Sequence, residues 1–178
     1  AGFVRLRVYT ADPYGTADER SRERALIENA YKALNRLPSH PAVQAARDFF
    51  PTEAEDRFVL VVEDTSGQSL RLHIEKPTLA LTFDQKLRIA RDLLSGLSHA
   101  HAHEVVHRNI CPSNILYGTD GQVRLINFDF ARSGTDRTTT IAGDIVDELE
   151  PEYQAPECFK DAGAASPVSD VFSAGVVL

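Results

Sequence analysis

Two short polar motifs on either side of a predicted β-hairpin constrain this chain more than any other feature. Residues 107–114 read H-R-N-I-C-P-S-N, and residues 127–129 read N-F-D. Between them lie two short apolar runs, 115–117 and 123–126, separated by a segment that contains Asp-Gly. An Asp-Gly pair between apolar runs is typical of a tight hairpin turn. The sequence therefore predicts a polar loop, a hairpin and a second polar loop in succession.

The two motifs resemble the catalytic loop and the metal-binding motif of protein kinases, which read H-R-D-x-x-x-x-N and D-F-G. In both, this chain has asparagine where the family has its reactive aspartate, at Asn109 and Asn127. Two further stretches match in the family's order, A-P-E at residues 155–157 and S-D-V-F-S-A-G-V at residues 169–176. Because four motifs occur in this order, the resemblance covers nearly the whole chain.

The resemblance implies an α+β, protein-kinase-like bilobal fold, with a small antiparallel-sheet N-lobe and a helical C-lobe. We expect a partial N-lobe over residues 1–62, a hinge over residues 63–68 and a partial C-lobe over residues 69–178. The chain opens within an alternating strand and closes within an apolar helix, so this fold is expected to be incomplete at both ends.

Local patterns predict the elements of these lobes. Alternation predicts a strand at residues 3–10, an apolar stripe predicts a helix at 18–37, and residues 42–64 read as two strands around a polar turn. The clearest helix spans residues 82–102, where a threonine and a glutamine three positions apart resemble a capping box. Its buried face is predicted to consist of Leu87, Ala90, Leu93, Leu94, Leu97 and Ala100.

Four residues occupy positions that line the nucleotide pocket in the family. Arg7 stands where the family has its phosphate-binding lysine, and keeps the positive charge on a bulkier, forked group. Arg5 stands where an alanine lines the adenine site, so its long side chain is expected to crowd the base. Val62, at the end of a predicted strand, and Asp64, in the hinge, complete the set. Periodicity alone instead favours a solvated strand face that carries two arginines.

The resemblance also implies a catalytic base at Asn109 and a magnesium site at Asn114, Asn127 and Asp129. An asparagine has no basic oxygen, and loss of a general base typically lowers a rate by about 10²–10⁴. Asn127 offers only a neutral oxygen, whereas Mg²⁺ prefers carboxylate ligands. Asp129, at the family's glycine, could turn a carboxylate toward a metal instead. Cys111 occupies the position at which the family has a lysine that contacts the phosphate. The sequence leaves open whether ATP and Mg²⁺ bind.

Two further assignments stay open. In the family, the helix at residues 18–37 carries a glutamate that pairs with the strand lysine. An ungapped count places Ala30 there, and Glu28 reaches the position only if two residues are inserted. The predicted activation segment, residues 131–154, is either a phosphorylation site read by Arg108 or a plain threonine-rich loop. Its clustered threonines are Thr135, Thr138, Thr139 and Thr140.

Residues 103–107 read H-E-V-V-H, which matches the zinc-binding signature of metalloproteases. That signature needs both histidines on one face of a helix. The two β-branched valines and the following proline, Pro112, instead predict a strand and a loop. The sequence therefore favours the kinase resemblance over a zinc site.

The resemblance assigns structural roles to several other residues. Leu34, His107 and Phe128 match the internal apolar stack of the family. Asp170 matches the helix-borne aspartate that anchors the backbone of the catalytic loop. Glu157 matches a glutamate that pairs with an arginine in later helices of the family.

Composition limits the possible functions. Hydrophobic residues make up 43% of the 178 positions, which is ordinary for a globular domain, and the net charge of −7 argues against a nucleic-acid surface. The sequence contains no run of about 18 apolar residues, which is the length needed to span a membrane. The two cysteines suit a reducing, cytoplasmic setting rather than a disulfide framework.

The sequence therefore predicts a pseudokinase, a kinase-like domain without phosphotransferase activity that serves as a regulatory, scaffolding or protein-binding module. Its expected partner is another protein or another domain of the same polypeptide, rather than nucleic acid or a membrane. Two alternatives stay open. One is an atypical active Ser/Thr protein kinase with altered metal ligands, and the other is a sensor that binds ATP without turning it over.

Overall fold

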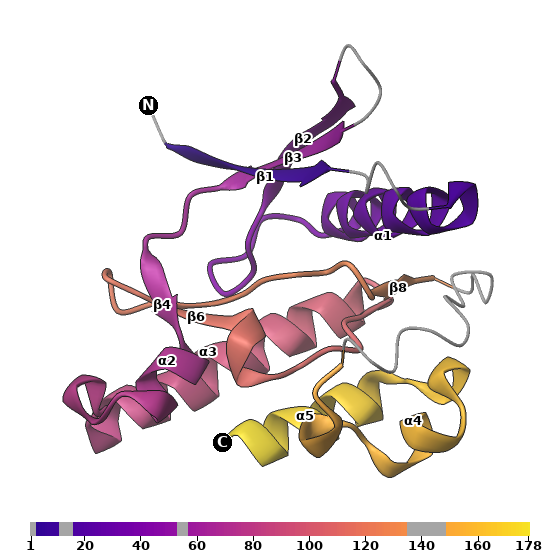
Figure 1. The fold of residues 1–178 in the computed structure, drawn as a ribbon. Helices are drawn as coiled ribbons and strands as arrows, with labels where there is room; N and C mark the ends of the chain where they lie inside the picture. The colour runs from indigo at the N-terminus through magenta and orange to yellow at the C-terminus, as the bar shows by residue number, and fades with distance from the viewer. Residues whose placement is uncertain (1–2, 11–15, 53–56, 135–148) are drawn as a thin grey trace.

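The computed structural model describes residues 3–10, 16–52, 57–134 and 149–178. A three-stranded antiparallel sheet and one long helix form an upper part, and a mostly helical part lies below them (Figure 1). This is the small-sheet and helical-lobe arrangement that the sequence predicts. Two predicted features lie outside the described residues: the tip of the turn between the two later strands, and the threonines Thr135, Thr138, Thr139 and Thr140.

The upper sheet has the strand order β1–β3–β2, and both outer strands run antiparallel to β3. In this register Arg5 is paired with Val62 and Arg7 with Leu60, so the two arginines share the sheet face that carries the buried Val62 and Leu60. The bounds agree with the predicted strands to within a few residues: β1 (Val4–Thr10), β2 (Ala46–Pro51) and β3 (Arg57–Glu63).

Helix α1 (Ala17–Arg36) packs against this sheet face. It begins at Thr16, whose side chain accepts from the backbone of Glu19 while the Glu19 side chain accepts from Thr16 in return. This capping box satisfies backbone donors that a helix start leaves without partners. The side chains that α1 and the sheet bury together are Ile27, Ala30, Phe58, Leu60 and Val62.

The lower part is organised around helix α3 (Phe83–Ala102), which starts at the predicted Thr82–Gln85 capping box. A second small sheet has the order β4–β6–β7, and β5 pairs with β8. The other elements of this part are β4 (Gly67–Ser69), α2 (Leu70–Glu75), β5 (Val105–Val106), the 3-10 helix η2 (Pro112–Asn114), β6 (Ile115–Gly118), β7 (Val123–Leu125), β8 (Arg132–Ser133), α4 (Pro156–Lys160) and α5 (Pro167–Val177).

The predicted buried face of α3 is wrong at two positions, and a third residue of it, Ala90, is only half-buried. Leu87 and Leu94 are 54% and 46% exposed, and the residues buried instead include Ile89 and Gly96. Gly96 lies so close to the connector between α1 and β2 (residues 37–45) that an added Cβ would stand 2.9 Å from the carbonyl oxygen of Ala42. The connector therefore packs against the side of α3 that carries Gly96, and Leu87 and Leu94 point outward. Periodicity had favoured the leucines only because they are larger and more apolar.

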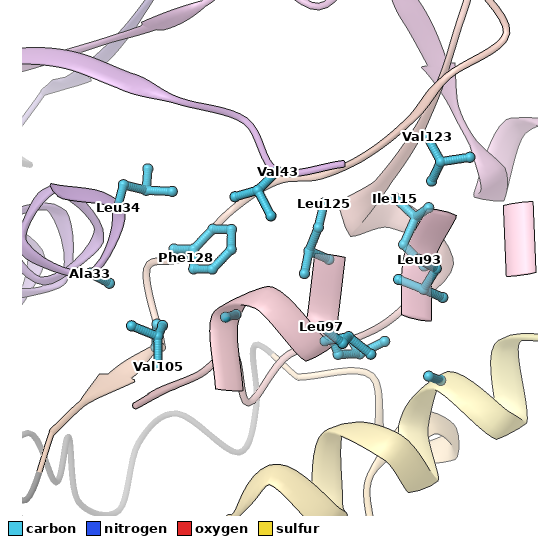
Figure 2. Close-up of a cluster of buried hydrophobic side chains, with 14 of the residues drawn as sticks. Ala33, Leu34, Val43, Leu93, Leu97, Val105, Ile115, Val123, Leu125 and Phe128 are labelled. Atoms are coloured by element: carbon cyan, nitrogen blue, oxygen red, sulfur yellow. The ribbon is translucent and has the colours of Figure 1, made fainter. Parts of the chain in front are cut away.

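The main core joins the upper and lower parts. Figure 2 shows the Phe128 ring between Leu34 of α1 on one side and Val43 and Leu125 on the other. Phe128 is completely buried, and Leu97 of α3 belongs to the same cluster. The predicted hairpin is present, since β6 and β7 pair antiparallel. Among the described residues, no helix is both long enough and apolar enough to cross a membrane.

Candidate functional site

The loop that follows β5 is anchored by a carboxylate from α5. Asp170, only 1% exposed, accepts hydrogen bonds from the backbone N–H groups of His107 and Arg108, each at 2.8 Å. Its Oδ2 also lies 2.8 Å from Nε2 of His101. Arg108 has a positive φ of 71°, a conformation that a non-glycine residue keeps only when its surroundings hold it there. The predicted anchoring role of Asp170 is therefore confirmed.

His107 is a neutral, structural imidazole. Its Nε2 lies 2.9 Å from the carbonyl oxygen of Ile126, and its Nδ1 accepts from the backbone N–H of Asn109 at 3.2 Å. One nitrogen must therefore carry a proton while the other is a lone-pair acceptor. The ring packs edge-on against Phe128, with centroids 4.6 Å apart. Burial lowers the pKa of His107, which keeps the ring uncharged at neutral pH.

The zinc-protease interpretation of residues 103–107 fails on geometry. His103 caps the end of α3, and the next residues form strand β5, so the two histidines do not share a helix face. His107 uses both ring nitrogens within the core. Throughout the part of the chain that the structure describes, no three histidine, cysteine or acidic side chains are placed to hold a metal ion.

A continuous chain of hydrogen bonds runs from β1 to the loop after β5. Arg7 Nη2 donates to Asn127 Oδ1 at 3.0 Å. Asn127 Nδ2 donates to Asn114 Oδ1 at 3.1 Å, and Asn114 Nδ2 donates to the carbonyl oxygen of Asn109 at 2.9 Å. We call this chain, from Arg7 through Asn127 and Asn114 to Asn109, the asparagine relay. It unites the strand arginine with three of the positions that the sequence assigned to catalysis and metal binding.

The relay fixes the orientation of both amide groups. A guanidinium only donates, so the atom of Asn127 that faces Arg7 must be its oxygen. The nitrogen of Asn127 then faces Asn114, which must present its own oxygen in return. Both side-chain oxygens therefore already accept an N–H. The donor to the Asn127 oxygen is the cationic guanidinium of Arg7, 3.0 Å away.

This donor set does not fit a Mg²⁺ ion. Mg²⁺ takes oxygen ligands in near-octahedral geometry and prefers carboxylates. The oxygens of Asn114 and Asn127 are neutral and each already accepts one hydrogen bond, so neither supplies the negative charge that Mg²⁺ favours. The nearby carboxylate, Asp129, is already paired with the guanidinium of Arg7 that bonds to Asn127.

Asp129, the one carboxylate of the N-F-D motif, is held by β1. Its oxygens accept from Arg7 Nη1 at 3.2 Å and from Arg7 Nη2 at 2.8 Å, a bidentate pair. The hydroxyl of Tyr9 donates to Asp129 Oδ2 at 3.4 Å. Burial, together with the charge of Asp129, raises the pKa of Tyr9 above its usual range, so Tyr9 remains a donor. The carboxylate is therefore neutralised within the protein.

Helix α1 contributes an asparagine to this site rather than a glutamate. Asn29 is 6% exposed, and its Nδ2 donates to the carbonyl oxygens of Asp129 at 3.0 Å and Ala131 at 2.5 Å. Sequence reasoning missed Asn29, although a polar residue between two buried positions of an apolar helix stripe signals a buried hydrogen bond. Of the two residues weighed for the family's glutamate, Ala30 is fully buried. Glu28 is a helix-surface charge that pairs with neighbours on α1.

The remaining pocket positions lie at the other end of β1. Arg5 Nη2 and Asp64 Oδ1 form an ion pair at 3.1 Å, with the Arg5 side chain half exposed. Val62 is 1% exposed and belongs to the cluster beneath α1. The structure thus brings Arg5 and Asp64 together, and places Val62 in the interior of the upper part.

Cys111 stands in an electronegative setting. The side chain is 3% exposed, and burial, followed by the charge of Glu150, raises its pKa to about 11. Glu150 also accepts from the Ser113 hydroxyl at 2.8 Å and pairs with Arg71 of α2. The position of the family's phosphate-contacting lysine is therefore occupied by a neutral thiol beside a carboxylate. Nothing in the sequence pattern had pointed to Glu150.

Glu157, the glutamate of the A-P-E motif, is bonded to α5. Its Oε1 accepts from the Ser169 hydroxyl at 2.7 Å, and this hydrogen bond lowers the pKa of Glu157. The bond ties α4 to α5 within a few residues of Asp170. It therefore supports the element that anchors the loop after β5.

The Arg7–Asp129 pair is expected to couple β1 energetically to the N-F-D motif. A double-mutant cycle with Arg7→Ala and Asp129→Ala should give a coupling energy of about 1–2 kcal/mol, because the pair is bidentate and mostly buried. The exposed Arg24–Glu28 pair on α1 is the matched control and should give about 0.3–0.5 kcal/mol. Urea unfolding of the four proteins of each cycle measures both values. Equal coupling in the two cycles would contradict the expected role of Arg7.

The known proteins that this chain resembles are protein kinases. A family model described as "Protein kinase domain" matches residues 15–178. The chain is 26% identical over 140 residues to the probable serine/threonine-protein kinase PknB of Lactococcus lactis, and 29% identical over 139 residues to the serine/threonine-protein kinase PrkC of Bacillus subtilis. It is 37% identical over 123 residues to the serine/threonine-protein kinase PknL of Mycobacterium tuberculosis.

These alignments cover 79%, 78% and 67% of the chain, but 21%, 20% and 29% of the three relatives. The chain thus spans less than a third of the length of the relatives it matches. The family model nevertheless matches most of the chain, and it includes both polar motifs and the Asp170 anchor. On these grounds, together with the small sheet, the helical part and the order of the motifs, the chain belongs to the protein kinase family.

Proposed function

We propose that this domain is a pseudokinase: it transfers no phosphate and acts as a regulatory, scaffolding or protein-binding module. The observation that carries the proposal is the asparagine relay with Arg7 at its end. In the family, the corresponding positions hold magnesium and activate the acceptor hydroxyl. In this chain the side chains of Asn127 and Asn114 bond to each other, to the Arg7 guanidinium and to the backbone carbonyl of Asn109.

The size of the chemical deficit supports this proposal. Phosphoryl transfer depends mainly on positioning and on neutralising the charge of the transferred group, which the metal ions do. Arg7 supplies a single fixed charge, and that charge is already neutralised by Asp129. Asn109 in addition removes the general base, a loss of about 10²–10⁴ in rate by itself. The two deficits act on different parts of the reaction, so they are expected to multiply.

The same contacts suggest what the domain does instead. Arg7, Asp129 and Asn29 bind the upper sheet, the N-F-D motif and helix α1 to one another through side chains of the protein alone. The three elements therefore need no nucleotide to hold them together. A domain whose parts keep a fixed arrangement without a ligand is suited to present a constant surface to another protein.

The proposed partner is a second protein or another domain of the same polypeptide, in a cytoplasmic setting. The net charge of −7 disfavours nucleic acid as the partner. Cys111 and Cys158 are both free thiols, which suits a reducing compartment.

An assay of phosphate transfer tests the proposal directly. With ATP and either Mg²⁺ or Mn²⁺, the protein is expected to label neither itself nor a general protein substrate above the level of a reaction without protein. The double variant Asn109→Asp/Asn127→Asp is also expected to remain inactive, because the new carboxylate at residue 127 would pair with Arg7. Measurable transfer by the unmodified protein would overturn the proposal.

Nucleotide binding is a separate readout that distinguishes the sensor alternative. At about 100 times its dissociation constant, a ligand stabilises a protein by about 2.7 kcal/mol, which a thermal-shift titration detects. We expect no metal-dependent shift with ATP. A shift that needs the metal and disappears in Asp129→Ala would instead identify an ATP sensor in which Asp129, released from Arg7, provides the carboxylate.

A further inference from the structure

Three histidines stand in a row between α3 and the connector that joins α1 to β2. The rings of His40 and His99 stack with centroids 4.6 Å apart and planes 20° apart. His99 and His103 also lie 4.6 Å apart, with planes inclined by 49°. His40 belongs to the connector, and the other two belong to the last turns of α3 and its cap. We call His40, His99 and His103 the histidine row.

The row makes one hydrogen bond within the connector and two between the connector and α3. His40 Nδ1 accepts from the backbone N–H of Ala42 at 3.2 Å, and His40 Nε2 lies 3.3 Å from the Ser95 hydroxyl. His99 Nε2 lies 2.9 Å from the carbonyl oxygen of Pro38. Because Nδ1 of His40 acts as an acceptor, this ring must be neutral and protonated on Nε2.

The connector in turn holds the strand that leads to the asparagine relay. The carbonyl oxygen of Ala42 accepts from the Leu125 N–H at 2.8 Å, and the Gln44 N–H donates to the carbonyl oxygen of Leu125 at 3.0 Å. Leu125 is the last residue of β7 and precedes Asn127 by two positions. A change at His40 therefore reaches the relay through a single ladder of backbone hydrogen bonds.

We infer that the histidine row is an acid-sensitive latch between α3 and the connector. Protonation of His40 places an N–H on Nδ1, directly opposite the N–H of Ala42, so this hydrogen bond is lost and two donors face each other. Protonation of His99 as well places two positive rings 4.6 Å apart. Both effects loosen the connector, and with it the hydrogen bonds to Leu125. The inference rests on the stacked rings and does not depend on the proposed function.

The charges around the row do not compensate for this repulsion. On α3, Arg91 and Asp92 pair with each other at 2.9 Å. His101 turns to the other side and meets Asp170. Where α1 ends and α3 is capped, Arg36 pairs with Glu104, and on the β7 side Arg124 pairs with Asp120. An open pocket of about 220 Å³ beside His40 gives water and protons access to the ring.

The pH dependence has a definite sign. Burial, followed by the nearby His99, lowers the pKa of His40 below its unfolded value of 6.5. At acidic pH the unfolded chain therefore binds more protons than the folded one, so stability falls as the pH falls. The contribution is fully present above pH 6.5 and is lost as the pH drops through the folded pKa. His107 follows the same sign, so a pH profile of the wild type alone does not isolate the row.

The variant His40→Asn isolates the contribution of the histidine row to the pH dependence of stability. An asparagine oxygen can accept from the N–H two residues ahead, as His40 Nδ1 does, but asparagine does not titrate. Between pH 7.5 and 5.5, the full-length wild type is expected to lose about 2–4 °C more in Tm than His40→Asn. His73→Asn is the matched control, because His73 lies outside the row and its Nδ1 also makes a hydrogen bond to backbone, to the carbonyl oxygen of Leu79. It should lose as much as the wild type. An equal loss in His40→Asn and wild type would overturn the latch.

Hydrogen exchange of the wild type gives a second test that needs no variant. After correction for the intrinsic rate at each pH, peptides that cover residues 40–45 and 123–127 should lose protection at pH 5.5. Peptides from the first part of β3 (residues 57–61) should keep theirs, because these residues pair with β1 and with residues 48–51 of β2 rather than with the connector. Uniform change across the three peptides, or no change in the first two, would show that the row does not act as a latch.

Discussion

Replacement of Asp170 with alanine is expected to lower the free energy of unfolding by about 3–5 kcal/mol. The side chain is almost completely buried, and it accepts from two backbone N–H groups of the loop after β5 and contacts His101. Alanine would leave these groups buried and without their acceptor. The backbone of Arg108, held at a positive φ, would also lose the bond that stabilises it. The expected fall in Tm is about 6–20 °C.

One further variant tests the charge of Asp170 apart from its shape, and another, at Asp84, is the matched control. Asp170→Asn keeps one oxygen acceptor of the same shape, so it should destabilise the protein less than Asp170→Ala. Asp84→Ala removes an exposed aspartate from the first turn of α3 and should change the free energy of unfolding by less than about 1 kcal/mol. Urea unfolding measures all three. If Asp170→Ala behaves like Asp84→Ala, the buried acceptor does not anchor the loop.

Phe128→Ala is expected to have a similarly large effect, about 3–5 kcal/mol. The Phe128 ring is completely buried, packs edge-on against His107 and fills the space between α1 and β7 (Figure 2). Its removal would leave a cavity at the junction of the upper and lower parts. The flanking Asn127 and Asp129 bond to Arg7, so a shift at Phe128 should weaken these bonds as well.

Phe83→Ala provides the matched control, because Phe83 is 72% exposed at the start of α3. We expect this change to affect the free energy of unfolding by no more than about 0.5 kcal/mol. Phe128→Leu should lie between the two, since leucine fills part of the cavity. A small effect of Phe128→Ala would mean that the cluster collapses around the missing ring, and that the two parts are held together mainly by the polar contacts of Arg7 and Asn29.

Asp170 and Phe128 are residues that this chain shares with the family pattern. In the asparagine relay, by contrast, other residues stand where the family has the residues that carry its chemistry. Both groups lie within the same few segments of the chain. The framework that positions the loop is therefore intact, while the polar atoms it positions are bonded to one another. This combination is what the proposed pseudokinase function requires.

The sequence alone determined the local elements and the order of the motifs. Alternation and helical spacing predicted β1, α1 and α3 to within a few residues, because such patterns depend on neighbours two to four positions apart. The replacement of aspartate by asparagine at residues 109 and 127 is likewise visible without any structure.

Only the tertiary structure decided which side chains meet. Arg7 and Asp129 are 122 positions apart, and Asn29 lies 100 positions from the carbonyl it binds, so no local pattern could pair them. The outward turn of Leu87 and Leu94 has the same origin, since it follows from the approach of the connector to Gly96. Periodicity determines which face of an element is apolar, but the docking of distant segments determines which groups that face contacts, and in this protein the asparagine relay and the histidine row both arise from that docking.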